Sequence, residues 1–174
     1  MSRGPFRFML TRRTSGSALT AGARLLRSDK GLLSARRPLS EITHVISVDG
    51  VPAPGAFSRA TIHNGLCYVS GTGASNDTAS GAVKEASAFD ETRGALENVA
   101  AILEAAGSSP ERIVVASMLL TNKSDYAECN RAYVQFFAER GMAEKLPART
   151  SAMWAVPTTA KVAFSVVAAV GKPD

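Results

Sequence analysis

The sequence predicts an α+β domain in which helices pack on one face of a β-sheet. Three short alternating, β-branched segments lie before residue 71, and two stretches with helical spacing of apolar residues follow, each leading into further β-rich sequence. The resulting order is strand, strand, strand, helix, strand, helix, strand, strand, without an internal repeat. The chain has 174 residues, of which 45% are apolar, so we expect one domain and an extension.

The first three strands are predicted from alternation and from turn residues. Residues 43–48 alternate and end at Asp49-Gly50. Residues 59–63 and 66–70 also alternate, and Asn64-Gly65 lies between them. This dipeptide suits a type I′ turn, because both central residues of that turn need a positive φ angle. We therefore expect a β-hairpin here.

Two amphipathic helices are predicted from apolar residues that recur three, four and seven positions apart. The first covers residues 88–106, with Ser87 as its cap and Gly107 at its end. The second opens at Ser124-Asp125 and closes near Gly141.

Three more strands complete the domain. Residues 112–120 are apolar and β-rich, and they lie between the two helices. Residues 149–156 and 161–170 follow the second helix and are joined by a short Pro-containing segment.

Residues 1–40 differ from the rest of the chain in charge. They carry nine basic residues against one acid, a net charge of +8, whereas residues 41–174 carry eleven bases and fourteen acids, a net charge of −3. An Arg-rich, acid-poor leader with short apolar clusters is typical of a mitochondrial transit peptide. We expect cleavage near residues 36–40 and a location in the matrix. The alternative is a basic arm that binds nucleic acid or an acidic surface.

Neither a membrane span nor a metal site is indicated. No apolar run approaches the roughly 18–20 residues that a membrane span needs. The two cysteines, Cys67 and Cys129, and the two histidines, His44 and His63, form no CxxC or HxxxH spacing. We expect both cysteines to be buried free thiols.

Arg149 stands out because charge is scarce around it. It follows Pro147 at the start of an apolar, β-branched stretch, and no Asp or Glu lies between Glu144 and Asp174. One interpretation is that Arg149 points to solvent or pairs with a distant surface carboxylate. The other is that an arginine at the entry to a packed sheet awaits a carboxylate or phosphate ligand, which its planar guanidinium suits.

Several short fragments are similar to the RidA/YjgF family, in the family's order and roughly at its spacing. They are Pro54-Gly55-Ala56-Phe57-Ser58, Tyr68-Val69-Ser70-Gly71, Ala95-Leu96-Glu97-Asn98, residues 102–107, Asn130-Arg131-Ala132-Tyr133 with Phe136-Phe137, and Pro147-Ala148-Arg149. No single fragment is specific, but together they span residues 42–170. The sequence thus resembles a mitochondrial member of this family, whose proteins are also called endoribonuclease L-PSP-like.

The resemblance implies a chorismate-mutase-like subunit, a mixed β-sheet with two helices on one face, for the domain at residues 41–174. It also implies a homotrimer with ligand clefts between neighbouring subunits. The implied activity is hydrolysis of reactive 2-enamine and 2-imino acids to 2-oxo acids and ammonia, without a metal or cofactor. The expected partners are a small carboxylate or imino-acid ligand and other copies of the chain, rather than a membrane or nucleic acid.

Site residues are also implied by the resemblance. Arg149 stands where the family has the arginine that binds the substrate carboxylate, and it is the catalytic residue that we expect. The other expected substrate-binding positions lie on separate segments of the chain: Asn130, Ser70, Gly71, Phe57, Ser58, Thr72 and Ser165.

Four positions depart from the family pattern. Phe57 stands in place of a tyrosine, and Thr72 in place of a glutamine. Family deaminases carry a glutamate on the last strand that orients the attacking water, and Ala163 stands there. A second common acid two residues on is replaced by Ser165, and no other carboxylate lies on this strand. The sequence therefore predicts ligand binding with weakened catalysis.

Three functions are compatible with these features. The first is a mitochondrial 2-imino-acid deaminase with an altered site. The second is a non-catalytic trimer that binds small carboxylates and serves regulation. The third is RNA cleavage or control of translation, but residues 41–174 have a net charge of −3 and show no basic stripe for phosphate contacts.

Overall fold

The computed structural model describes residues 41–51, 55–74, 86–155 and 159–171, and the transit peptide predicted at residues 1–40 lies outside them. From Ile42 onward the chain forms one compact unit. Over the described ranges the strands and α-helices follow the predicted order, with two short 3-10 helices added. No helix in these ranges is long and apolar enough to cross a membrane.

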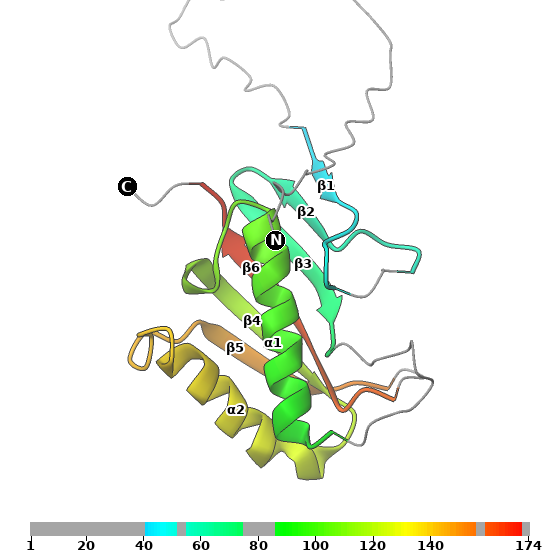
Figure 1. The fold of residues 1–174 in the computed structure, drawn as a ribbon, viewed down its shortest axis with the longest axis vertical. Helices are drawn as coiled ribbons and strands as arrows, with labels where there is room; N and C mark the ends of the chain where they lie inside the picture. Colours follow the sequence, from blue (N-terminus) through cyan, green and yellow to red (C-terminus); the bar gives the residue numbers. More distant parts are fainter. Residues whose placement is uncertain (1–40, 52–54, 75–85, 156–158, 172–174) are drawn as a thin grey trace, which may run out of the picture. The chain divides into compact units, whose positions relative to one another are not determined.

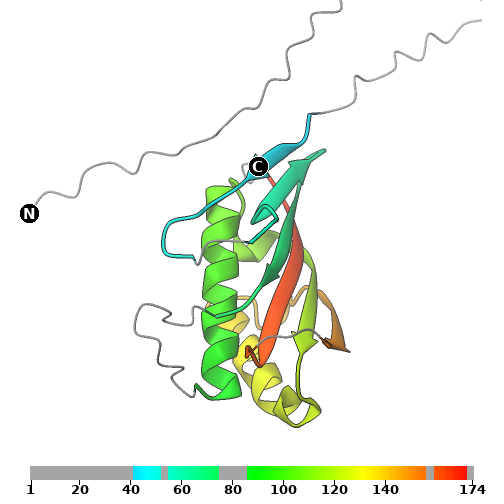
Figure 2. The same cartoon turned by 90° about the vertical axis from the view of Figure 1, so that its right-hand side faces the viewer.

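The described strands form one six-stranded mixed sheet in the order β1-β2-β3-β6-β4-β5 (Figure 1). Neighbouring strands run antiparallel, except β4 and β5, which are parallel. Helices α1 and α2 lie on the same face of this sheet (Figure 2), which confirms the predicted fold class. The elements are β1 Thr43–Val45, β2 Ala60–His63, β3 Leu66–Thr72, α1 Ala88–Ala105, η1 Pro110–Arg112, β4 Ile113–Leu120, η2 Lys123–Asp125, α2 Tyr126–Ala138, β5 Ala148–Met153 and β6 Val162–Ala169.

The predicted hairpin turn and the predicted ends of the first helix are confirmed. Asn64 and Gly65 join β2 to β3 and have positive φ angles of 50° and 75°, as a type I′ hairpin requires. The Ser87 hydroxyl accepts the N–H of Asp90 at 3.1 Å and caps α1. Gly107, with a φ angle of 74°, directly follows the end of that helix.

The ends of several elements differ from the prediction. β1 ends at Val45, because Val45 pairs with Ala60 and the partner strand begins there. A 3-10 turn precedes α2, because the Asn122 side chain accepts the N–H of Ser124 at 3.1 Å and closes a tight turn. The strand predicted at residues 149–156 is Ala148–Met153.

The environment that we predicted for Arg149 is wrong. Among the described strands, β5 pairs with β4 alone and lies at the edge of the sheet. Every residue of β5 except Arg149 is exposed. Arg149 therefore lies on an open edge strand rather than at the entry to a packed sheet. Its register partner is Ala116, which is 1% exposed, so both residues face the helices.

Aromatic side chains form the core between α2 and the sheet. Tyr133, Phe136 and Phe137 of α2 and Phe164 of β6 are each at most 2% exposed. The Tyr133 ring lies 4.8 Å from the Phe137 ring and 6.0 Å from the Phe164 ring, centroid to centroid. Burying each such side chain contributes about 1.5–3 kcal/mol. This packing fixes α2, and with it the residues that face Arg149.

The opposite face of the sheet is covered by neither described helix (Figure 2). Alternation along the strands places uncharged side chains on it, and Tyr68 among them is 42% exposed. They include Thr61, Tyr68, Val115, Ser117, Leu119, Thr150, Ser165 and Val167. A broad sheet face without charge is suited to contact with another protein surface.

Candidate functional site

Arg149 is held by three side chains on one face of α2. Its Nη2 donates a hydrogen bond of 2.7 Å to the Asn130 side-chain oxygen and lies 3.4 Å from the Tyr126 hydroxyl. Its guanidinium carbon lies 4.5 Å from the centre of the Tyr133 ring. Residues 126, 130 and 133 share a helix face because they are four and three positions apart. The predicted neighbours Arg149 and Asn130 are thus brought together.

The three side chains orient the guanidinium without neutralising its charge. Asn130 and the two tyrosines are uncharged, and the three ion pairs among the described residues join other side chains: Arg93–Glu139, Arg140–Glu97 and Lys161–Glu91. Glu128 on α2 does not face Arg149, since it lies two residues from Tyr126 and about 200° around the helix. A guanidinium has five N–H donors, and only Nη2 is used in these contacts. The remaining donors suit a planar anion such as a carboxylate.

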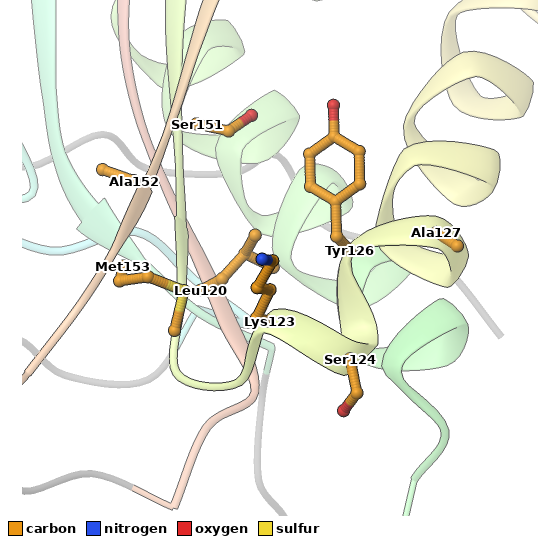
Figure 3. A pocket seen from close by; sticks show the side chains of 8 residues that line it. All are labelled: Leu120, Lys123, Ser124, Tyr126, Ala127, Ser151, Ala152 and Met153. Atoms are coloured by element: carbon orange, nitrogen blue, oxygen red, sulfur yellow. The ribbon is translucent and has the colours of Figure 1, made fainter.

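A hollow of about 450 Å³ lies between β5 and the start of α2, and Arg149 is not among the residues that line it (Figure 3). Tyr126 belongs to both features, because it lines the hollow and contacts the arginine. Figure 3 shows the Tyr126 ring and the Ser151 hydroxyl on opposite sides of this space. The lining residues are Leu120, Lys123, Ser124, Tyr126, Ala127, Ser151, Ala152 and Met153. The hollow is therefore mostly apolar with a few polar groups, as ligand sites commonly are.

A second group of predicted site residues lies away from β5 in the strand order, on β3 and just before β2. The Ser70 hydroxyl on β3 donates to the Ser58 carbonyl at 2.8 Å. The Ser58 hydroxyl lies 3.1 Å from Nδ1 of His44 on β1. Phe57 is 52% exposed, and Gly71 lies in the irregular part of β3 between Val69 and Thr72. We call Phe57, Ser58, Ser70 and Gly71 the serine cluster.

Two hydroxyls among the expected substrate-binding positions, those of Thr72 and Ser165, donate to backbone carbonyls. Thr72 is 1% exposed and donates to the Ser70 carbonyl at 2.8 Å. Ser165 on β6 donates to the Val69 carbonyl at 2.9 Å. Ala163, at the position of the family glutamate, is 1% exposed in the single chain. The Ser165 hydrogen bond joins β6 to β3. The Thr72 hydrogen bond lies within the irregular end of β3.

One chain does not bring the predicted site residues into one place. Arg149 lies on β5 and Ser70 on β3, and strands β6 and β4 separate them. Three strand spacings amount to about 14 Å, which is beyond the reach of a small imino acid. Arg149 with Asn130 forms one half of the candidate site, and the serine cluster forms the other.

Residues that sequence reasoning missed take part in both halves. Tyr126 and Tyr133 share the spacing of Asn130 on α2, so helical periodicity carried a signal for them. His44 contacts Ser58 across fourteen residues of chain, and nothing in the local sequence indicates that contact. Arg59 is also missed; it is 6% exposed and lies next to Ser58.

The cysteines are not suited to nucleophilic chemistry. Cys67 and Cys129 are free and fully buried. Burial raises the pKa of Cys67 to about 11 and also raises the pKa of Cys129, so the reactive thiolate is scarce near neutral pH. Among the described residues, no group of three or more His, Cys, Asp or Glu side chains is placed to hold a metal ion.

The fold and the arginine together define a class of protein. It is a small α+β domain whose described helices lie on one face of the sheet, with an edge-strand arginine that contacts α2. The sequence profile of the Endoribonuclease L-PSP family matches residues 49–170. The chain belongs to this family, which confirms the resemblance to RidA/YjgF proteins.

Individual relatives agree with this assignment. A 2-iminobutanoate/2-iminopropanoate deaminase from Capra hircus is 31% identical over 134 residues, which are 76% of this chain and 93% of that protein. The mitochondrial protein mmf2 from Schizosaccharomyces pombe is 32% identical over 108 residues, 62% of this chain and 79% of that protein. The crystal structure of TdcF from E. coli with bound serine has a TM-score of 0.64 and 28% identity, and covers 73% of this chain and 98% of TdcF.

Proposed function

We propose that this chain is the subunit of a mitochondrial homotrimer that hydrolyses 2-imino acids to 2-oxo acids and ammonia. The observation that carries the proposal is the state of Arg149, whose guanidinium is oriented by Asn130 and Tyr133 but meets no carboxylate among the described residues. The similarity to deaminases of 2-iminobutanoate and 2-iminopropanoate supports the substrate class. No metal or cofactor enters the proposed reaction.

Arg149 binds the substrate carboxylate and fixes the imine carbon in the cleft. A bidentate guanidinium–carboxylate pair is both strong and directional, and fixing the substrate removes much of the entropic barrier to water attack. Water adds to the carbon of the C=N bond, and a proton moves to the nitrogen. The C–N bond of this carbinolamine then breaks, which releases ammonia and leaves the 2-oxo acid.

The cleft is completed by a second copy of the chain. Arg149 with Asn130 and the serine cluster lie at different strands of one sheet, so they meet only if one copy supplies each half. The uncharged sheet face opposite the helices gives the copies a surface through which to associate. In a trimer this arrangement repeats three times and leaves three equivalent clefts.

The altered last strand lowers the expected rate. Ala163 and Ser165 stand where the family has acids, and Ser165 is engaged with the Val69 carbonyl. Loss of a general acid–base group typically costs about 10²–10⁴-fold in rate. A protonated imine is already electrophilic, so positioning by Arg149 still leaves a measurable reaction.

The test is imine decay in the presence of the purified protein. An amino-acid oxidase generates 2-iminobutanoate in place, and its disappearance is followed with and without the protein. We expect faster decay with the wild type and with Arg93→Ala, because within the described residues Arg93 pairs with Glu139 away from Arg149. Arg149→Met should match the sample without protein. Equal decay for wild type and Arg149→Met contradicts the proposal.

A second function is favoured by one observation, the absence of a carboxylate on β6. A trimer that binds small carboxylates without turnover needs Arg149 and the cleft, but it needs no residue to activate water. Binding of 2-oxobutanoate that depends on Arg149, together with imine decay no faster than in buffer, identifies this function instead.

The mitochondrial location is proposed from the leader. Its composition is typical of a transit peptide, and one relative, mmf2, is named as mitochondrial. Import of the full chain into isolated mitochondria, with protection from added protease and a size reduced by about 4 kDa, is the expected result. A chain that lacks residues 1–40 should stay outside.

A further inference from the structure

Arg59 is a buried cation with no side-chain partner among the residues that the structure describes. It lies directly before β2 and is 6% exposed. Within the described part of the chain, its guanidinium makes no ion pair, and Nε is fully covered without a hydrogen-bond partner. The terminal nitrogens are not among these enclosed unsatisfied atoms.

Such a state is unfavourable unless an anion completes it. An unpaired buried charge is costly, and arginine cannot escape the cost by losing its proton. Burial does lower the pKa of Arg59. The buried acid Glu91 shows how this chain satisfies a charge elsewhere. Glu91 is 8% exposed and accepts the Lys161 N–H at 2.7 Å, with the Lys161 ammonium 3.5 Å away.

The backbone of Arg59 lies next to the serine cluster. Its carbonyl accepts the Ser70 N–H at 2.9 Å, and its neighbour Ser58 accepts the Ser70 hydroxyl at 2.8 Å. A second arginine, Arg59, thus lies next to the half of the site that contains Ser58 and Ser70. In the assembled cleft, Arg149 comes from one copy and Arg59 from the other.

We propose that Arg59 binds a second carboxylate of the ligand, so that the preferred substrates are 2-imino dicarboxylates. This inference rests on the proposed function, because it places the serine cluster opposite Arg149. Two arginines at one cleft match a ligand with two negative charges, whereas a monocarboxylate leaves one of them unpaired. The planar guanidinium of Arg59 suits a carboxylate.

The same charge could instead be met by a side-chain carboxylate of the neighbouring copy. In that case Arg59 stabilises the assembly and does not affect which ligand binds. The two sources of the carboxylate are separated by measuring ligand selectivity and assembly on the same variants.

The experiment is calorimetric titration of the full chain with stable product-like ligands. 2-Oxoglutarate carries the second carboxylate, and 5-methyl-2-oxohexanoate has nearly the same shape, with an uncharged isopropyl group in its place. We expect the wild type to bind 2-oxoglutarate about tenfold more tightly, the size of one shielded charge-assisted contact. Arg59→Met should remove this difference and leave the affinity for 5-methyl-2-oxohexanoate within about twofold. Arg59→Lys should retain part of the difference.

Folding of the variant provides an independent readout. Removing an unpaired buried charge should leave the melting temperature of the ligand-free protein unchanged or raise it. A lower melting temperature or a smaller oligomer for Arg59→Met, with unchanged selectivity, shows that a neighbouring copy pairs with Arg59 and overturns the proposal.

Failure of this inference is distinct from failure of the proposed function. If the wild type binds both ligands equally and Arg149→Met abolishes binding, only the role of Arg59 is wrong. If neither ligand binds the wild type, the carboxylate site at Arg149 is wrong as well.

Discussion

Asn130→Asp should replace the neutral amide that contacts Arg149 by a carboxylate. This carboxylate competes with a ligand carboxylate for the guanidinium. The Asn130 oxygen already accepts the Nη2 hydrogen bond at 2.7 Å, so the new carboxylate needs no rearrangement to form an ion pair. A ligand carboxylate must then displace it from the guanidinium. A hydrogen bond to a charged group contributes about 1.5–3 kcal/mol, so ligand affinity should fall about 10–150-fold.

The same substitution should stabilise the folded chain. Arg149 and Asn130 are both only partly buried, which limits the gain from the ion pair to about 1 kcal/mol. Beside Arg149, the pKa of the new carboxyl is lowered in the folded state. The added stability is therefore present above the ordinary aspartate value of about 3.9, and it is lost as the pH falls through the lowered folded-state value.

Titration with 2-oxobutanoate and urea unfolding at several pH values test both effects together. In the wild type, the Asn122 side-chain oxygen accepts the Ser124 N–H at 3.1 Å. Asn122→Asp is a matched control, because it adds the same charge and its carboxylate still accepts this N–H. The control should bind as the wild type does. Wild-type affinity in Asn130→Asp, with no pH-dependent gain in stability, would refute the conclusion that the Arg149 charge is free to bind a ligand.

Three further predictions concern other parts of the chain. Ala163→Glu restores the family acid on β6 and should raise the turnover of imino acids by about 10²-fold or more. Ala163→Gln is the uncharged control and should not raise it. Equal rates for the two variants would show that the wild type does not lack a group that activates water. Tyr133→Phe removes a buried hydroxyl that has no hydrogen-bond partner among the described residues and keeps the ring under Arg149. Urea unfolding should therefore show a change within about 1 kcal/mol, and a larger loss would reveal a further contact. Burial raises the pKa of Cys67 to about 11, so native protein at pH 8 should react with iodoacetamide far more slowly than unfolded protein at both Cys67 and Cys129; rapid labelling would mean that the thiols are accessible.

Much of the fold follows from local chemistry. The hairpin at Asn64-Gly65 was predictable because few other residues adopt positive φ angles at low cost. Ser87 and Gly107 mark the ends of α1 for similar local reasons. The lengths of β1 and β5 were not predictable in this way, because a strand ends where its partner in the sheet ends. The edge position of β5 also depends on strand order, which no local pattern encodes.

The candidate site also has a part that could be predicted from the sequence and a part that depends on how distant segments fold together. The family resemblance placed Arg149 and Asn130 at the same site but not in direct contact, and the spacing of Tyr126 and Tyr133 on α2 is consistent with that site. The contact of His44 with Ser58 and the burial of Arg59 depend on how distant segments fold together. The separation of Arg149 from Ser70 is a property of the sheet order, and it is the reason that a second copy enters the proposal.

The most direct test of the account is a crystal structure of the protein with 2-oxobutanoate bound. The account predicts a trimer in which the ligand carboxylate lies about 2.7–2.9 Å from the Arg149 guanidinium, with Ser70 of the partner subunit on the other side of the ligand. A ligand bound elsewhere, or an occupied Arg149 with no partner subunit at the cleft, would contradict it.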